Sequence, residues 1–211
     1  MKDLSMRWLA GWSAATGHLW TDEGGVVRIE ALMSSRRFEY LLIEPDERDM
    51  TAITGLIGGD SRDVVTVFTK KPEHYLVPHH GLVLDRDDEA LMTRTLEATP
   101  SPIPAGYETR WEATGDLTNL LVLHGHELAA CGNLARVGRD AVFDRIETMP
   151  KHRRHGLGRF VMQALTSRAL ENGADSGLLA ASADGQLLYE TLGWHNECAM
   201  LMFRGTEDAE I

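Results

Sequence analysis

A stretch of positively charged residues and glycines in the second half of the chain has the composition of an anion-binding loop. Of the nine residues from Lys151 to Arg159, six are Lys, Arg or His, although the chain carries a formal net charge of −11. Gly156 and Gly158 lie within this stretch, and an apolar helical pattern begins directly after them. A glycine-rich turn that enters a helix directs unpaired backbone N–H groups at one point, and arginines add forked donors suited to phosphate oxygens. The stretch therefore predicts a site for a pyrophosphate group.

Two common phosphate-binding motifs do not fit the residues around these glycines. A Walker loop requires Gly-Lys-Ser/Thr, whereas Gly158 is followed by Arg159 and Phe160. The dinucleotide fingerprint requires three glycines spaced GxGxxG, and the loop supplies Gly156 and Gly158 alone. A nucleotide hydrolase that binds ATP with magnesium is therefore disfavoured.

The residues that are present resemble the coenzyme A loop of the GCN5-related N-acetyltransferase (GNAT) superfamily. Residues 153–158 match R-x-x-G-x-G and follow a predicted strand that ends at Thr148-Met149-Pro150. Residues 188–194 match a second hallmark of the superfamily, L-Y-x-x-x-G-F/W. The resemblance covers residues 107–205 well. It implies an α/β fold with a mixed, mostly antiparallel twisted sheet flanked by helices.

The resemblance also implies an activity and a cosubstrate. In this superfamily the amides of the loop bind the pyrophosphate of coenzyme A, so we expect an enzyme that uses acetyl-CoA. The expected reaction is direct attack by an amino group of a small molecule on the acetyl thioester. Ser182 stands where many relatives carry an asparagine that contacts the pantetheine arm. The expected coenzyme-binding residues are Ile146, Glu147, Thr148, Arg153, Arg154, His155, Gly156, Leu157, Gly158, Arg159 and Ser182.

Acyl transfer to an amine needs a donor to the developing oxyanion, a base for the nucleophile and an acid for the departing thiolate. The resemblance makes Tyr189 the candidate acid and the strand backbone before the loop the candidate oxyanion donor. In a regular strand Asp144 shares a face with Ile146 and Thr148, whereas Glu147 lies on the opposite face. Relatives that use a carboxylate base often carry it on this strand, upstream of the residues that contact the pantetheine, so the resemblance together with this parity favours Asp144 as the base. Glu147 and a chain of water molecules are the alternatives.

A different class of function, a non-catalytic module that binds acyl-CoA for regulation or assembly, is the main alternative. Such a module needs the loop but has no use for an acid at the thiolate. The presence of Tyr189 beside a complete loop therefore favours the enzyme.

A metal site is not expected. His74, His79 and His80 lie close together in the sequence, but zinc requires further ligands in a matching pattern. The distant His124 and His126 do not supply one.

The composition is that of an ordinary globular protein of 211 residues, with 43% hydrophobic and 25% charged residues. An excess of 32 acidic over 21 basic residues argues against nucleic acid and anionic membranes as partners. No run of eighteen apolar residues occurs, so we expect no membrane span. Two cysteines do not indicate a disulfide framework, and the expected location is the cytoplasm. The oligomeric state stays open, with a homodimer as one option.

Three prolines between residues 100 and 104 predict a stiff linker over 100–106. We expect an N-terminal α/β half over 1–99 and the acetyl-CoA-binding domain over 107–205. The N-terminal half either completes the sheet or forms a degenerate GNAT-like domain, and we detect no internal repeat in the sequence.

The elements that must position the candidate residues follow from periodicity and turn signals. An apolar stripe with two tryptophans predicts a helix over residues 2–20. A helix starting at Gly156 or Leu157 should follow the loop, and a second one, capped by Asp184, should span 185–192. The remaining expected elements are a helix from Pro45 or Asp46 to Ile57 and strands at 26–32, 38–43, 64–68, 81–84, 90–96, 107–112, 119–124, 127–136, 141–149, 177–182 and 198–203.

Overall fold

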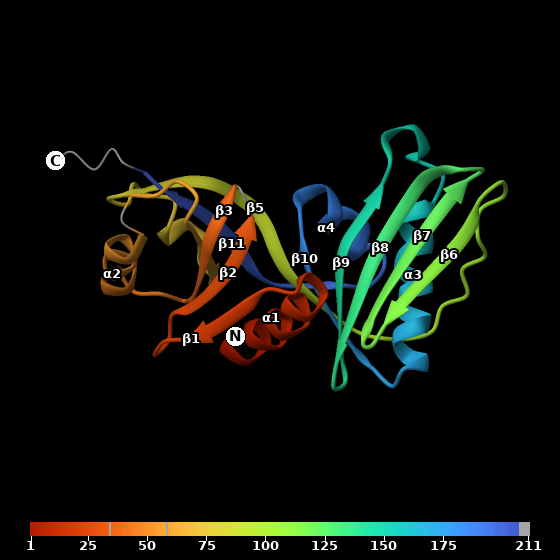
Figure 1. Ribbon diagram of the computed structural model, residues 1–211, viewed down its shortest axis with the longest axis horizontal. Helices are drawn as coiled ribbons and strands as arrows, with labels where there is room; N and C mark the ends of the chain where they lie inside the picture. Colours follow the sequence, from red (N-terminus) through yellow and green to blue (C-terminus); the bar gives the residue numbers. More distant parts are fainter. Residues whose placement is uncertain (34, 58, 207–211) are drawn as a thin grey trace.

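The computed structural model describes residues 1–33, 35–57 and 59–206, and these form one eleven-stranded sheet with helices on both faces (Figure 1). The order of the strands across the sheet is β1-β2-β3-β4-β11-β5-β10-β9-β8-β7-β6. The helices are α1 (Lys2–Thr16), α2 (Glu47–Ile57), α3 (Leu157–Glu171) and α4 (Ala183–Glu190), with 3₁₀ turns at Pro72–His74 and Pro150–His152. The strands are β1 (Leu19–Asp22), β2 (Val27–Met33), β3 (Arg36–Ile43), β4 (Val64–Thr69), β5 (Leu82–Thr95), β6 (Glu108–Thr114), β7 (Leu117–His124), β8 (Glu127–Val137), β9 (Asp140–Thr148), β10 (Ser176–Ala181) and β11 (His195–Gly205).

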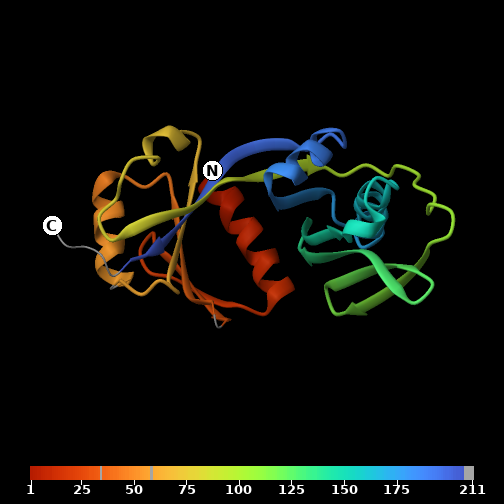
Figure 2. The same ribbon diagram turned by 90° about the horizontal axis from the view of Figure 1, so that it is seen from above.

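The predicted fold class is confirmed. Most neighbouring strands of the sheet are antiparallel, and the two parallel pairs are β3 with β4 and β9 with β10. Each parallel pair is connected by a helix, α2 in one case and α3 in the other, as parallel strands require. The first hundred residues complete the sheet. The proline segment 100–106 runs along the outside of the molecule between β5 and β6 (Figure 2), and its role as a domain boundary stays a prediction.

The sheet contains the same arrangement of elements twice. We call the part of the sheet from β1 to β4, with α2, the first lobe, and the part from β6 to β10, with α3 and α4, the second lobe. In the first lobe, β1, β2 and β3 form an antiparallel series, and α2 leads to β4 beside β3. In the second lobe, β7, β8 and β9 form such a series, and α3 leads to β10 beside β9. The strands that end the two units exchange places, because β5 pairs with β10 and β11 pairs with β4. The repeat that the sequence does not reveal is therefore present in the topology.

Helices α1 and α3 pack against opposite faces of the sheet. Val142 and Leu178 join the core cluster of Trp8 and Leu9 from α1, whereas their chain neighbours Phe143 and Leu179 join the cluster built around α3. This alternation is what a period of two along a strand produces. Figure 2 shows α1 lying across the junction of the two lobes, so this helix joins them.

Several boundaries differ from the prediction, and strand β1 was not predicted. Three of the differences have a clear structural cause. The first helix ends at Thr16 because Gly17 adopts a left-handed conformation, with φ of 76°, and its N–H bonds to the carbonyl of Ser13. The strands expected at 81–84 and 90–96 are one continuous strand, β5. The charged residues between them are exposed, so they interrupt the apolar pattern of the sequence but not the strand. Helix α4 begins earlier than expected because Ser182, and not Asp184, is its N-cap.

Gly11 lies in the middle of α1, where glycine normally weakens a helix. A Cβ atom at this position would lie 2.2 Å from Cγ2 of Val142 on β9. The glycine therefore allows α1 to approach the second lobe closely.

We predict that Gly11→Ala destabilises the protein by about 1–3 kcal/mol, since overpacking against Val142 outweighs a gain in helix propensity of about 1 kcal/mol. The matched control is Gly55→Ala in α2, where nothing lies within 4 Å of a new Cβ. This variant should be more stable by about 0.5–1 kcal/mol. Urea unfolding followed by circular dichroism measures both, and equal stabilisation by the two substitutions would contradict the packing explanation.

Candidate active site

A groove of about 930 Å³ opens in the second lobe between the end of β9, the start of α3 and helix α4. All predicted site residues line this groove except Asp144 and His155. Segments that lie far apart in the sequence therefore meet, as expected from the two motifs. The lining residues are Ile146, Glu147, Thr148, Arg153, Arg154, Gly156, Leu157, Gly158, Arg159, Ser182, Asp184, Gly185, Leu187, Leu188, Tyr189 and Thr191.

The turn before α3 contains two residues in the left-handed region. After the 3₁₀ turn over Pro150–His152, Arg154 has φ of 65° and Gly156 has φ of 78°. Gly156 is the N-cap of α3 and offers no side chain to the helix, and the first helical hydrogen bond runs from the N–H of Phe160 to the carbonyl of Gly156 at 3.0 Å. The N–H groups of the first turn therefore lack helical partners and are open to an anion.

Three arginines surround this helix start. Within the described part of the chain, none of Arg153, Arg154 and Arg159 forms an ion pair with a carboxylate. Arg153 Nε lies 3.4 Å from the carbonyl of Thr148, and Arg159 Nη2 donates to Thr191 Oγ1 at 3.1 Å. Their charges are therefore uncompensated locally, as a phosphate-binding site requires.

Strands β9 and β10 separate beside the groove. Their parallel pairing ends at Val142 and Leu178, although β9 continues to Thr148 and β10 to Ala181. Backbone N–H and C=O groups on the β10 side of β9 are therefore open to an extended ligand over residues 143–148. This opening connects the groove with the opposite face of the sheet.

A β-bulge lies in β9 at this opening. Arg145 and Ile146 together stand opposite the single residue Gly132 of β8. Arg145 has φ of 51°, a conformation that costs free energy for a residue with a side chain. A Cβ atom on Gly132 would lie 2.6 Å from Cδ1 of Ile146, so the glycine makes room for the bulge.

The bulge changes which side chains share a face. The predicted parity, with Asp144 and Ile146 on one face and Glu147 on the other, is wrong because it assumes a regular strand. Gly132 and Ile146 lie on the α3 face of the sheet. The residues on either side of Gly132, Cys131 and Asn133, therefore point to the other face. Their partners in β9, Glu147 and Asp144, point to that face with them. Both carboxylates therefore lie on the face against which α1 packs.

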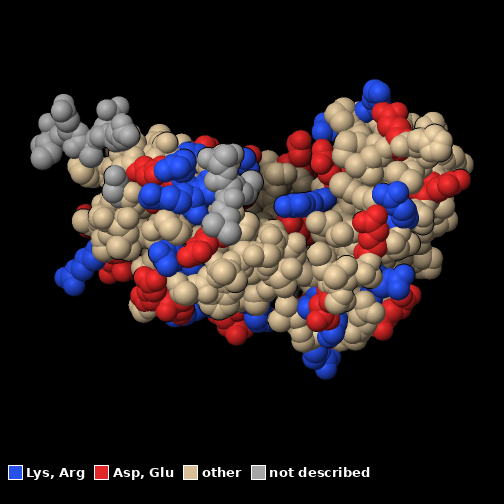
Figure 3. All heavy atoms as spheres, viewed as in Figure 1, with Lys and Arg blue, Asp and Glu red and all other residues tan. Residues whose placement is uncertain are grey.

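Asp144 is partly buried between the two lobes. Burial raises the pKa of its carboxyl group, and the backbone N–H and charge of Arg145 oppose this shift. His18, in the segment after α1, is close enough for its charge to act on Asp144 as well. Burial lowers the pKa of His18, which favours the neutral imidazole. Figure 3 shows the surface hollowed between the lobes, with acidic and basic side chains on the walls of the hollow.

Tyr189 lies on α4 at the inner end of the groove and is 7% exposed. Burial, together with the charge of Asp144, raises the pKa of its hydroxyl to about 12. The hydroxyl forms no hydrogen bond to any of the described residues. At neutral pH it is therefore a protonated donor that is free to bond to a ligand.

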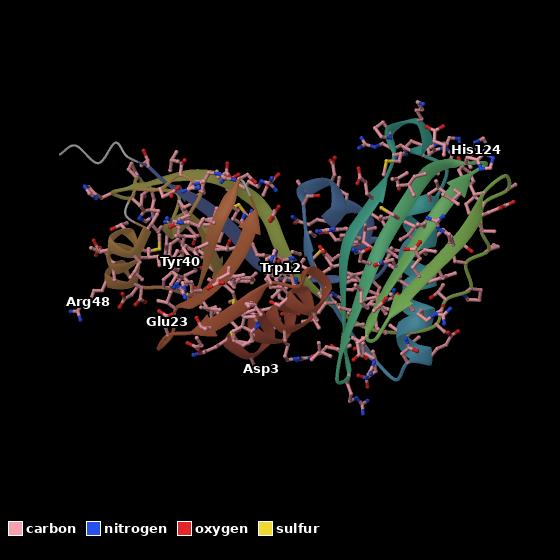
Figure 4. The ribbon with its side chains drawn as sticks, in the orientation of Figure 1. Asp3, Trp12, Glu23, Tyr40, Arg48 and His124 are labelled. Atoms are coloured by element: carbon pink, nitrogen blue, oxygen red, sulfur yellow. The ribbon has the colours of Figure 1, made fainter. Side chains whose placement is uncertain are left out.

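Two predicted coenzyme contacts also have structural roles. The Oγ of Ser182 accepts a hydrogen bond from the N–H of Gly185 at 3.4 Å and caps α4, while the residue lines the groove. His155 lies outside the groove lining, and its Nδ1 is 3.2 Å from the carbonyl of His152. Its ring belongs to an aromatic cluster with Tyr107, His152 and His124, the last at the end of β7 (Figure 4).

Sequence reasoning missed several groove residues on α4 and also His18. The α4 residues surround the tyrosine of the second motif, and the helix predicted over residues 185–192 already carried most of them, so the positions next to Tyr189 on that helix could have been named as groove residues. His18 has no such signal because it is remote in sequence from the loop and reaches Asp144 only through the packing of α1. The missed residues of the groove are Asp184, Gly185, Leu187, Leu188 and Thr191.

Within residues 1–33, 35–57 and 59–206, no group of three or more His, Cys, Asp or Glu side chains could hold a metal ion. His74, His79 and His80 line a pocket of the first lobe, away from the groove. In the same part of the chain, none of the helices has the length and apolar character needed to cross a membrane.

The chain resembles solved structures along almost its whole length. A GCN5-related N-acetyltransferase from Kribbella flavida is 16% identical with a TM-score of 0.69, and the match covers 97% of this chain and 94% of that one. A second GCN5-related N-acetyltransferase, from Sphaerobacter thermophilus, is 14% identical with a TM-score of 0.61 over 97% and 93% of the two chains. A tandem GNAT protein from the clavulanic acid biosynthesis pathway is 14% identical with a TM-score of 0.58 over 86% and 80%. At these identities the likeness concerns the fold.

Sequence comparison identifies the family. Among curated proteins, none matches this chain in sequence. The profile of the acetyltransferase (GNAT) family matches residues 88–194, slightly more than half of the chain, and this range contains the loop, the bulge and Tyr189. The chain therefore belongs to the acetyltransferase (GNAT) family.

Proposed function

We propose that this protein transfers the acetyl group of acetyl-CoA to an amino group of a small molecule. The observation that carries the proposal is the continuity of one path. The groove is lined by the start of α3 with its uncompensated arginines, by Ile146 to Thr148 of β9 beyond its pairing with β10, and by Tyr189. We take these three features to bind, in turn, the pyrophosphate, the pantetheine amides and the thioester of acetyl-CoA.

Different residues along the groove carry out the steps of the reaction. The amine nitrogen attacks the thioester carbonyl, a C–N bond forms, and backbone N–H groups of Ile146 to Thr148 stabilise the oxyanion. When the C–S bond breaks, the hydroxyl of Tyr189 donates its proton to the coenzyme thiolate. The proton lost by the amine goes to Asp144, directly or through water, and the bulge directs this carboxylate to the face opposite the coenzyme loop.

Direct attack is favoured over an acyl-cysteine intermediate. Burial raises the pKa of the thiol of Cys131, and burial raises that of Cys198 to about 11. Neither thiol is therefore ionised at neutral pH, and a thiol is a much poorer nucleophile than a thiolate.

The acceptor amine is proposed to enter from the hollow between the lobes (Figure 3). Asp144 and Glu147 face this side, and His18 lies near Asp144. The carboxylates attract the cationic form of the amine, which loses one proton to solvent before it attacks, and Asp144 accepts the second proton as the amide forms.

Replacing Tyr189 with Phe should lower kcat by about 10–100-fold while the Kd of acetyl-CoA stays within twofold, because proton donation to the thiolate is lost but the ring remains. Thiol release over a panel of small amines, with calorimetric titration of acetyl-CoA, measures both quantities. Tyr40→Phe, at a buried tyrosine of the first lobe, is the control and should leave kcat unchanged. If the parent bound acetyl-CoA but acetylated no amine, the non-catalytic module would replace this proposal.

The double substitution of Arg153 and Arg159 by Ala should weaken the binding of coenzyme A at least tenfold, since each charge-assisted hydrogen bond to phosphate is worth about 1.5–3 kcal/mol. The affinity of the variant should also depend less on salt. Arg110→Ala, at an exposed position of β6, removes one positive charge far from the groove and should change the Kd less than twofold. If the double variant and Arg110→Ala lost the same affinity for coenzyme A, specific recognition of the pyrophosphate by Arg153 and Arg159 would be ruled out.

Asp144→Asn should abolish the acid limb of the pH profile of kcat/KM. Because burial raises the pKa of Asp144, activity should rise with pH through a value above the usual carboxyl range as the base ionises. The raised pKa also means that folding stability is lost as pH rises from the ordinary carboxyl pKa through the pKa of the folded state, so the stability gain of the Asn variant should grow over this window and then level off. Glu112→Gln, which alters an exposed carboxylate of β6 outside the groove, is the control and should keep the acid limb. An unchanged acid limb in Asp144→Asn would exclude this residue as the base.

A further inference from the structure

The first lobe has a pocket at the position that corresponds to the coenzyme groove of the second lobe. In the repeated arrangement, α2 corresponds to α3, and the connection from β4 to β5 corresponds to the connection that contains α4. A pocket of about 560 Å³ lies between the start of α2 and residues 74–80 of that connection. Its lining residues are Pro45, Asp46, Glu47, Met50, Thr51, Thr54, His74, Tyr75, Val77, Pro78, His79 and His80.

This pocket lacks the features that suit a coenzyme. Strands β3 and β4 stay paired as far as Ile43 and Phe68, so they leave no opening for a pantetheine arm. The carboxylate of Asp46 accepts hydrogen bonds from the N–H groups of Arg48 at 2.8 Å and Asp49 at 2.9 Å. The amides that would hold a phosphate are thus occupied by a side chain of the protein.

The charge of the pocket is opposite to that of the groove. Its lining contains the carboxylates of Asp46 and Glu47 and, among the described residues, no Lys or Arg, whereas the groove is lined by three arginines. Arg48, the basic residue of α2, points outward from the helix and away from the sheet (Figure 4). With its three histidines uncharged, the pocket therefore repels anions and attracts cations.

The other wall is apolar and aromatic, and its shape is fixed. The hydroxyl of Tyr75 donates to the carbonyl of Pro45 at 2.7 Å, which ties the two walls together. His79 lies edge-on against Phe203, and its Nε2 is 3.1 Å from the carbonyl of Tyr75. Val77 is 53% exposed at this wall, so apolar surface is available to a ligand. A volume of this size suits a small molecule.

We propose that this pocket is a second binding site, specific for a small organic cation with an apolar or aromatic body. The carboxylates at the start of α2 bind the cationic group, and the wall of residues 74–80 receives the body. The proposal concerns a site separate from the groove and does not depend on acetyl transfer.

The test is a titration of the ¹⁵N-labelled full-length chain, with and without coenzyme A, followed by amide chemical shifts. The probes are 2-phenylethylamine, neutral 2-phenylethanol and anionic 3-phenylpropanoate. The amine should shift signals of residues 45–54 and 74–80, whether or not coenzyme A is present, and bind at least fivefold more tightly than the alcohol. Equal affinities of the three probes, or shifts confined to the second lobe, would overturn the proposal.

Three variants complete the test. Asp46→Asn keeps an N-cap, because the amide oxygen of Asn accepts the same hydrogen bonds, but removes the charge. It should weaken binding of the amine at least threefold and leave the alcohol unchanged. Thr51→Trp, at an exposed position on the pocket rim, should block both probes, whereas Glu112→Gln on the distant edge strand β6 should change neither. Unaltered amine affinity in Asp46→Asn and Thr51→Trp refutes the site. A failure of the parent to bind coenzyme A would contradict the acetyltransferase proposal alone.

Discussion

The separation of β9 from β10 after Val142 is the constraint on which the rest of the second lobe depends. Two parallel strands that stop pairing leave backbone groups without partners, and such groups are costly unless water or a ligand satisfies them. The fold places the start of α3 on one side of this opening and α4 on the other. The bulge at Arg145 contributes to this separation, because an extra residue in β9 bends the strand away from β10.

The two lobes use one topology for different purposes. Where β9 and β10 diverge, β3 and β4 stay paired to their ends, and where α3 begins with a glycine, α2 begins with a capping carboxylate. A few residues at a helix start therefore decide whether the same arrangement of strands and helices favours an anion or excludes one. The sheet itself does not determine which ligand binds, because the residues that differ between the lobes lie in the connections between strands.

Much of the second lobe could be predicted from the sequence because its signals are local. The glycines, the arginines and the tyrosine motif determine the groove within short segments, and the strands before them alternate clearly. The parity of Asp144 and Glu147 could not be predicted, since the bulge depends on Gly132 of another strand. The contribution of His18 depends on the docking of α1, which Gly11 permits through contact with a residue far along the chain. Pairings between remote segments leave no periodic trace in the sequence, and for the same reason the repeat stayed hidden.

The exchange of β5 and β11 has a consequence for how the chain is made. The first lobe needs β11 beside β4, yet β11 begins more than 120 residues after β4 ends. Until then the edge of β4 has no neighbour on that side, and an unpaired edge of buried, β-branched residues is prone to association with other chains. During synthesis β4 must therefore wait for residues 195–205, and the nascent protein is vulnerable to aggregation until that segment has emerged.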